Sequence, residues 1–185
     1  ESEMAGDTDD GEKSPVTATT WGNTRTRRNF HREGRGHVQF VSDPRTFVEA
    51  AVTIREEDEP VLPEAHARVA VAVERIDAGE SGGTRRERWA LCPVESAVVD
   101  ETVPTINRGF GAVIEATVAA SRLDVAAYDT DALLSRLRFF AETVARCGGR
   151  PEREAFATLD AATDWRERLP DDAEDDVPRF DGQSR

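Results

Sequence analysis

The stretch ARVAVAVERI, residues 67–76, decides the fold class of this 185-residue chain. Its three valines recur at every second position, which is the spacing of a strand with one buried face. A glycine-rich turn, DAGESGGT, follows, and residues 85–99 form a second extended run. The two runs are predicted to pair as an antiparallel hairpin. Pro93 predicts a bend or an edge position in the second strand, because proline has no N–H for the ladder.

Upstream of the hairpin, the sequence predicts two more strands and two short helices. Residues 16–21 (VTATTW) and 37–42 (HVQFVS) are rich in β-branched or aromatic side chains and are predicted strands. Between them, the turn GNTRT leads into a helix over roughly 26–33. Asp43 and Pro44 open the second helix, because aspartate caps a helix and proline suits the first helical position.

Downstream of the hairpin, the spacing of apolar residues changes from two to about 3.6, which is typical of helices. Three amphipathic helices are predicted at residues 107–123, 130–149 and 151–165. Strands therefore precede the main helices instead of alternating with them. This order predicts an α+β fold and argues against a doubly wound nucleotide-binding fold.

The formal net charge is −13, and much of the excess acid lies near the two ends of the chain. Both ends lack the apolar residues needed to offset chain entropy, so we expect disordered acidic tails. The predicted organisation has four parts: a tail at 1–14, a β-domain at 15–103, a helical region at 104–165 and a tail at 166–185.

The composition also limits where the protein works and what it binds. Lys13 is the only lysine among 24 basic residues, which suggests a salt-adapted, halophilic source. No apolar run is long enough to span a membrane and no signal peptide is visible, so a cytoplasmic location is expected. Cys92 and Cys147 are accordingly expected to be free, structural thiols. The acidic net charge argues against nucleic-acid binding, which relies on several phosphate contacts.

Several enzyme motifs are missing from the sequence. It contains no GxGxxG after a strand, no P-loop, no HExxH, no pair of CxxC motifs and no GxSxG elbow. No metal ligand set and no general acid or base can therefore be assigned, and the catalytic residues stay unknown.

The most unusual stretch is TWGNTRTRRNF, residues 20–30, where arginines crowd together in an acidic chain. Thr24 and Thr26 offer hydroxyls at the start of the predicted helix, and Arg25 and Arg28 can reach the same anion. Backbone N–H groups, hydroxyls and guanidinium groups at a helix N-terminus are the donors that a phosphate requires. The same arginines could instead balance nearby carboxylates on a salt-adapted surface. The residues alone leave both interpretations open.

A second unusual stretch begins at Asn107 and Arg108, next to Gly109 and Gly111. In one interpretation, Asn107 caps the helix and the glycines allow close helix packing. In the other, the two polar side chains contact a ligand. Both interpretations stay open from the residues alone.

Four stretches together, TWGNTRTRRNF, DPRTFVEAAV, VPTINRGFGAVIEATVAASRL and RFFAETVARCGGRPEREA, resemble an archaeal family of unknown function, family 447 in the domain-of-unknown-function series. The resemblance covers roughly residues 15–160 and is most specific in the third stretch and in CGG. Members of this family are similar to FMN-binding split barrels. The resemblance implies a split β-barrel followed by a helical region, in a homodimer with FMN at the subunit interface.

The resemblance also implies a function, that of an FMN-binding protein and an FMN-dependent oxidoreductase of unknown substrate. The implied site residues are four at the FMN phosphate and two that contact the flavin or the partner subunit: Thr24, Arg25, Thr26 and Asn29, then Asn107 and Arg108.

This chain departs from the family at its N-terminus. Family members begin with a strand pair that the residues before Val16 cannot supply, so we expect about four strands and a partial split barrel. The alternative function is a non-catalytic dimerisation protein that has lost its flavin site with those strands.

Overall fold

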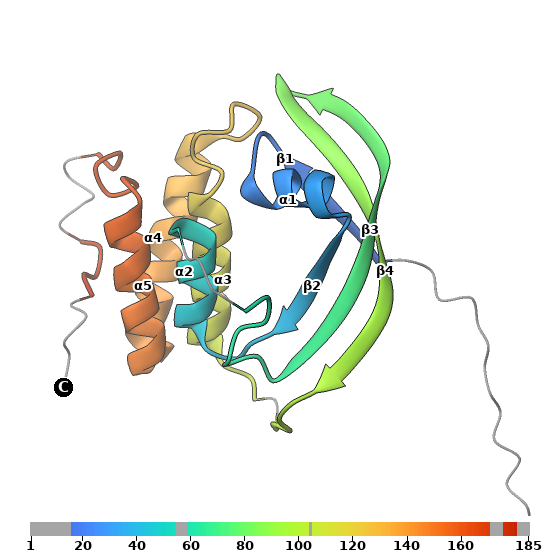
Figure 1. Ribbon diagram of the computed structural model, residues 1–185. Coiled ribbons are helices and arrows are strands. Elements are labelled where there is room, and N and C mark those ends of the chain that lie inside the picture. The colour runs from blue at the N-terminus through green and yellow to red at the C-terminus, as the bar shows by residue number, and fades with distance from the viewer. Residues whose placement is uncertain (1–15, 55–58, 104, 171–175, 181–185) are drawn as a thin grey trace, which may run out of the picture.

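The computed structural model describes residues 16–54, 59–103, 105–170 and 176–180, so the predicted tail at 1–14 lies outside the described residues. A sheet forms one side of the molecule and a helical layer the other, with α1 on the concave side of the sheet (Figure 1). The α+β class is confirmed. In chain order the elements are β1 (Val16–Trp21), α1 (Arg25–Glu33), β2 (Arg35–Phe40), α2 (Pro44–Val52), β3 (Ala67–Ser81), β4 (Thr84–Val98), α3 (Arg108–Ala120), α4 (Thr130–Cys147) and α5 (Arg150–Ala162).

The described sheet has four strands in the order β1-β4-β3-β2, and every neighbouring pair is antiparallel. The predicted hairpin is confirmed as its central pair, β3 and β4, each of 15 residues. Gly82 and Gly83 form the turn with positive φ values of 57° and 76°, a backbone region that favours glycine. The hairpin is long and curved in Figure 1, and the two strands from the N-terminal part of the chain flank it.

The hairpin carries a β-bulge near its open end. Val71 pairs with Pro93 and Ala70 pairs with Glu95, which leaves Val94 as the extra residue. The bend expected at Pro93 therefore takes the form of a bulge. The described part of β1 reaches only as far as Leu91 of β4, so none of the described residues lies beside Pro93 on that side.

Helix α1 packs on one face of the sheet. Phe30 of α1 meets Trp89 of β4 edge to face, with ring centroids 5.3 Å apart. Trp89 is buried and donates its indole N–H to Thr20 Oγ1 of β1 at 3.0 Å, so its polar atom is satisfied. The small core on this face contains Val71, Trp89 and Leu91, with Ala18, Phe30, Val69 and Val73 packed against it.

The larger core lies between helices α2, α3, α4 and α5. Val113, Leu137, Phe156 and Trp165 have no exposed surface there. α3 approaches the end of α4 so closely that a Cβ on Gly109 would lie 2.6 Å from a backbone atom of α4's C-cap. A side chain at this position would therefore separate the two helices.

The expectation of a disordered C-terminal segment is wrong for its described residues. Leu169 and Val177 are buried, and Phe180 packs against the helical core. A guanidinium nitrogen of Arg166 donates to the carbonyl of Pro178 at 2.7 Å. The segment is acidic overall, but Leu169, Val177 and Phe180 bury apolar surface against the helices and so hold its described residues there.

The two cysteines are both free, as expected, but Cys92 and Cys147 are exposed rather than buried in the core. Within the described residues, none of the helices combines the length and the apolar character required to span a bilayer.

Candidate functional site

The predicted phosphate-binding residues lie at the start of α1. Gly22 turns the chain with a φ of 64°, and Thr24 then caps the helix by accepting a hydrogen bond from the Arg27 N–H at 3.2 Å. Arg25 and Thr26 are the first two helical residues. The three residues Thr24, Arg25 and Thr26 therefore lie in one turn, with the helix dipole positive at this end.

Several donors of this turn have no partner among the residues that the structure describes. The backbone N–H groups of Arg25 and Thr26 have no hydrogen-bond partner in the described part of the chain, as expected for the first residues of a helix. The Arg25 guanidinium and the Thr26 hydroxyl also have no partner among the described side chains. One anion placed here could accept hydrogen bonds from all of these groups.

The other arginines of the helix have structural roles. Arg28 donates to the backbone carbonyl of Asn23 at 3.1 Å and so braces the turn that precedes the helix. Arg32 donates to Asn29 Oδ1 at 3.0 Å. Of the two arginines predicted to reach a common anion, Arg25 is therefore the one whose guanidinium has no partner in the described structure.

A buried carboxylate that the sequence interpretation missed explains another arginine. Glu87 of β4 has no exposed surface. Arg85 donates to its Oε1 from two nitrogens, at 2.9 and 2.6 Å, and Arg27 donates to the same oxygen at 3.2 Å. On the other oxygen, His31 Nε2 lies at 2.7 Å and Arg27 Nε at 3.0 Å. Arg27 and His31 thus anchor α1 to the central strand.

Burial by itself raises the pKa of Glu87, but the hydrogen bonds with Arg27, His31 and Arg85 outweigh it and hold the pKa at about 2. Glu87 is therefore ionised at neutral pH. A signal for this site was present in the sequence, because Glu87 lies two residues before Trp89 and so on the buried face of the strand. Arg27 does balance a carboxylate, but a buried one of the central strand and not one on a salt-adapted surface.

Two hollows flank α1. One, of about 480 Å³, is lined by Thr24 and Thr26 and, from the segment after α3, by Arg122 and Tyr128. The other, of about 530 Å³, lies toward β2 and is lined by Thr26 and Asn29. Three of the four predicted phosphate-site residues therefore border concave surface, and Thr26 borders both hollows.

The structure separates Asn107 and Arg108 from these hollows, neither of which they line. Asn107 caps α3, where its Oδ1 accepts from the Phe110 N–H at 3.0 Å and its amide donates to the buried Glu152 at 2.9 Å. The capping interpretation is the one that the structure shows. Arg108 is exposed and has no partner among the described residues.

The comparisons with known proteins agree on a family. Residues 9–100 match the family model described as "Protein of unknown function (DUF447) N-terminal domain", and residues 107–160 match "Protein of unknown function (DUF447)". None of the curated proteins matches the chain.

A solved structure is similar to this one. It is the FMN-bound protein MM1853 from Methanosarcina mazei, which is 24% identical over 82% of this chain and 83% of its own length, with a TM-score of 0.68. At this level of identity, the likeness shows a shared fold. Because the two family models together match most of the sequence, the chain belongs to the DUF447 family.

Proposed function

We propose that this chain binds FMN and holds the FMN phosphate at the start of α1. The observation that carries the proposal is a set of donors in one helical turn with no partner among the described residues: the N–H groups of Arg25 and Thr26, the Thr26 hydroxyl and the Arg25 guanidinium. Charge-assisted hydrogen bonds to a phosphate are stronger than neutral ones, and the helix dipole adds about 0.3–1 kcal/mol. The FMN-bound relative supports a flavin phosphate as the anion.

The shape of the surface fits a cofactor of this size. The two hollows beside α1, of about 480 and 530 Å³, fall in the range of small-molecule sites, roughly 300–1,000 Å³. The hollow of about 480 Å³ is also lined by the aromatic residues Trp21, Phe30 and Tyr128. A flavin ring is planar and apolar on its faces, so we assign the ring to this hollow and the phosphate to the adjoining donors of Arg25 and Thr26.

We further propose that the protein is an FMN-dependent oxidoreductase that acts as a homodimer of split-barrel type. Bound FMN would supply the redox chemistry, while the chain supplies binding and orientation. Trp21 and Tyr128 are each 37% exposed, so a partner subunit could cover them together with the flavin. Arg108, exposed and unpaired in the described structure, is available to that partner.

The test compares FMN with riboflavin, which lacks only the phosphate, in fluorescence titrations. The double variant Arg25→Met, Thr26→Val should bind FMN more than tenfold more weakly, about 1.4 kcal/mol, because charge-assisted hydrogen bonds are lost. Its riboflavin affinity should not change. Arg88→Met is the matched control, since Arg88 is an exposed arginine of β4 outside both hollows.

An equal loss of FMN and riboflavin affinity would contradict the phosphate assignment. A wild-type protein that binds neither flavin, and shows no visible flavin absorption after soaking in FMN, would contradict the function itself. A colourless dimer in light scattering would then favour a non-catalytic dimerisation protein.

A further inference from the structure

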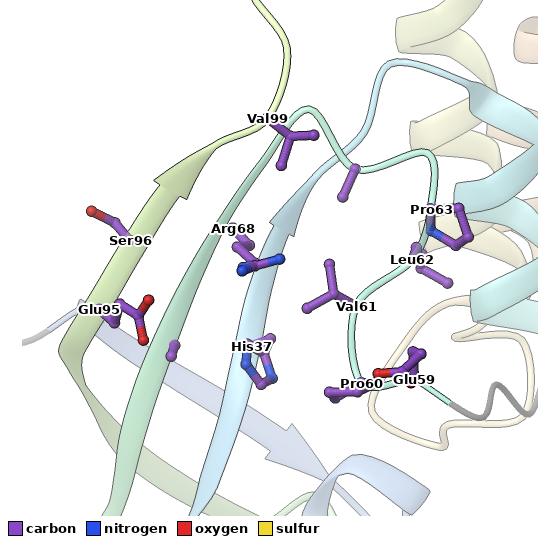
Figure 2. Close-up of a pocket in the computed structure, with 12 residues that line it drawn as sticks. His37, Glu59, Pro60, Val61, Leu62, Pro63, Arg68, Glu95, Ser96 and Val99 are labelled. Carbon is purple, nitrogen blue, oxygen red and sulfur yellow. The ribbon is translucent and has the colours of Figure 1, made fainter.

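A third hollow, of about 490 Å³, lies on the sheet near the open end of the hairpin. Three neighbouring strands each contribute one ionisable side chain to it: His37 from β2, Arg68 from β3 and Glu95 from β4 (Figure 2). Val61 and Leu62, from the loop before β3, form an apolar wall beside them. The hollow therefore combines both signs of charge with an apolar surface.

Strand register places the polar groups on one face. His37 pairs with Ala70, and Ala70 pairs with Glu95, so the three residues form one row across the sheet. Arg68 lies two residues before Ala70 on the same strand and shares its face. Two strand spacings separate His37 from Glu95, roughly 9–10 Å between Cα atoms. The small side chain of Ala70 leaves space between them.

The β-bulge puts Glu95 in this row. In a regular ladder continuing from the Val71–Pro93 pair, Glu95 would pair with Val69, whose face is covered by α1. The extra residue, Val94, moves Glu95 to the opposite face, because a shift of one residue reverses the direction of a side chain. Bulges commonly re-aim side chains in this way next to binding sites.

The apolar wall is held in place by Gln39. Its amide nitrogen donates to the carbonyl of Pro60 at 3.3 Å, and its amide oxygen accepts from the Leu62 N–H at 2.7 Å. The loop ends where the His66 N–H donates to the carbonyl of Phe40 at 2.9 Å. The wall is thus positioned by β2, the strand that carries His37.

The loop adds a second carboxylate, Glu59, to the hollow, and none of its ionisable side chains is paired within the described structure. His37, Arg68 and Glu95 have no hydrogen bond or ion pair to any described residue. Arg68 and Glu95 are diagonal neighbours on adjacent strands, within reach of each other, yet they do not pair. A guanidinium and a carboxylate left open over an apolar wall complement a ligand that carries both charges and an apolar group.

We propose that this hollow binds a small zwitterion with an apolar body, such as a free amino acid. Its carboxylate would contact Arg68, its ammonium group would contact Glu95, and its side chain would lie against Val61 and Leu62. This proposal does not depend on FMN binding, and Arg68 and Glu95 lie outside both hollows beside α1, although His37 also lines the hollow that contains Thr26 and Asn29.

The test uses L-phenylalanine with two probes that each lack one charge, 3-phenylpropionate and phenethylamine. The chain has three histidines, so the imidazole proton signals in an NMR spectrum are few, and a His37→Gln variant assigns the reporter. Phenylalanine should shift the His37 signal in a saturable way without moving those of His31 and His66. Each single-charge probe should bind at least about tenfold more weakly.

Arg68→Met and Glu95→Gln should each weaken phenylalanine binding by more than about tenfold, and Arg88→Met should not. FMN titrations of Arg68→Met should match the wild type, which separates this site from the flavin site. No response of His37 to phenylalanine up to about 10 mM would overturn the proposal. Equal binding of 3-phenylpropionate and phenylalanine would also overturn it, since it would show a site for an anion alone.

Discussion

Replacing Glu87 by glutamine should destabilise the protein strongly, although the side chain keeps its size. The carboxylate has no exposed surface and makes contacts at 2.6–3.2 Å with Arg85, Arg27 and His31. Glutamine removes the negative charge and turns one acceptor into a donor that faces cationic donors. The arginine side chains would then have lost the carboxylate that compensates them.

The magnitude follows from how well these cations can be rehydrated. Breaking a buried ion pair by removing one partner costs about 3–5 kcal/mol. Arg85 is 56% exposed and can recover water, whereas Arg27 is 13% exposed and cannot. We therefore expect a loss of about 2–4 kcal/mol, which in a chain of this size lowers Tm by about 4–16 °C.

The effect should depend on pH in a defined direction. The folded-state pKa of Glu87, about 2, lies below its usual value of 4.5. The stabilisation by Glu87 is therefore fully present above pH 4.5 and is lost as the pH falls from there through about 2. The gap in unfolding free energy between wild type and Glu87→Gln should be largest at neutral pH and should narrow below pH 4.5.

Urea unfolding followed by circular dichroism, repeated at several pH values, measures this gap. Glu142→Gln is the control, because Glu142 forms an exposed i,i+4 pair with Arg146 and should change stability by less than about 0.5 kcal/mol. A variant as stable as the wild type would refute the reasoning. A gap that stays constant with pH would show that shape, and not charge, carries the effect.

Three further predictions concern the helical layer. Gly109→Ala should lower the free energy of unfolding by about 1–3 kcal/mol, because its Cβ would lie 2.6 Å from the backbone of Gly148. Gly111→Ala, whose Cβ would have no neighbour within 4 Å, should instead raise it by about 0.5–1 kcal/mol. Denaturant unfolding compares the two variants. Asn107→Ala should lower the free energy of unfolding by about 1–2 kcal/mol, because it removes the helix cap and the hydrogen bond to Glu152 of α5. Asn107→Asp keeps the cap but places a second carboxylate beside Glu152, so this variant should become more stable on acidification. Thermal unfolding measures both. Arg166→Met should release residues 176–180, seen as faster amide exchange there with little change in the exchange of α4.

Most elements could be predicted because local chemistry specifies them. Asp43 and Pro44 do cap and open α2, and Gly34 ends α1 in the left-handed conformation. The alternating valines of β3 do lie on the face that packs against α1. These signals are read within a few residues, so no tertiary information is required.

The parts that could not be predicted depend on contacts between distant residues. Nothing local distinguishes Arg27, which reaches a carboxylate 60 positions away, from Arg25, which has no partner in the described structure. Asn107 could be recognised as a cap, but its bond to Glu152 requires knowing that α5 packs beside α3. The direction of Glu95 depends on the bulge, and the sequence indicated only that the strand is irregular at Pro93.

The strand order also constrains how the chain can fold. β1 and β2 are synthesised before the hairpin, but each pairs with one of its strands. Val16 pairs with Leu91, so β1 has no complete ladder until the ribosome has released β4 as far as Leu91. A hairpin closes through short-range contacts within about 1–10 microseconds. The outer strands pair across longer loops, whose closure loses more conformational entropy. We therefore expect the hairpin to close before β1 joins the sheet, and α1 gains its anchor at Glu87 only after β4 has left the ribosome.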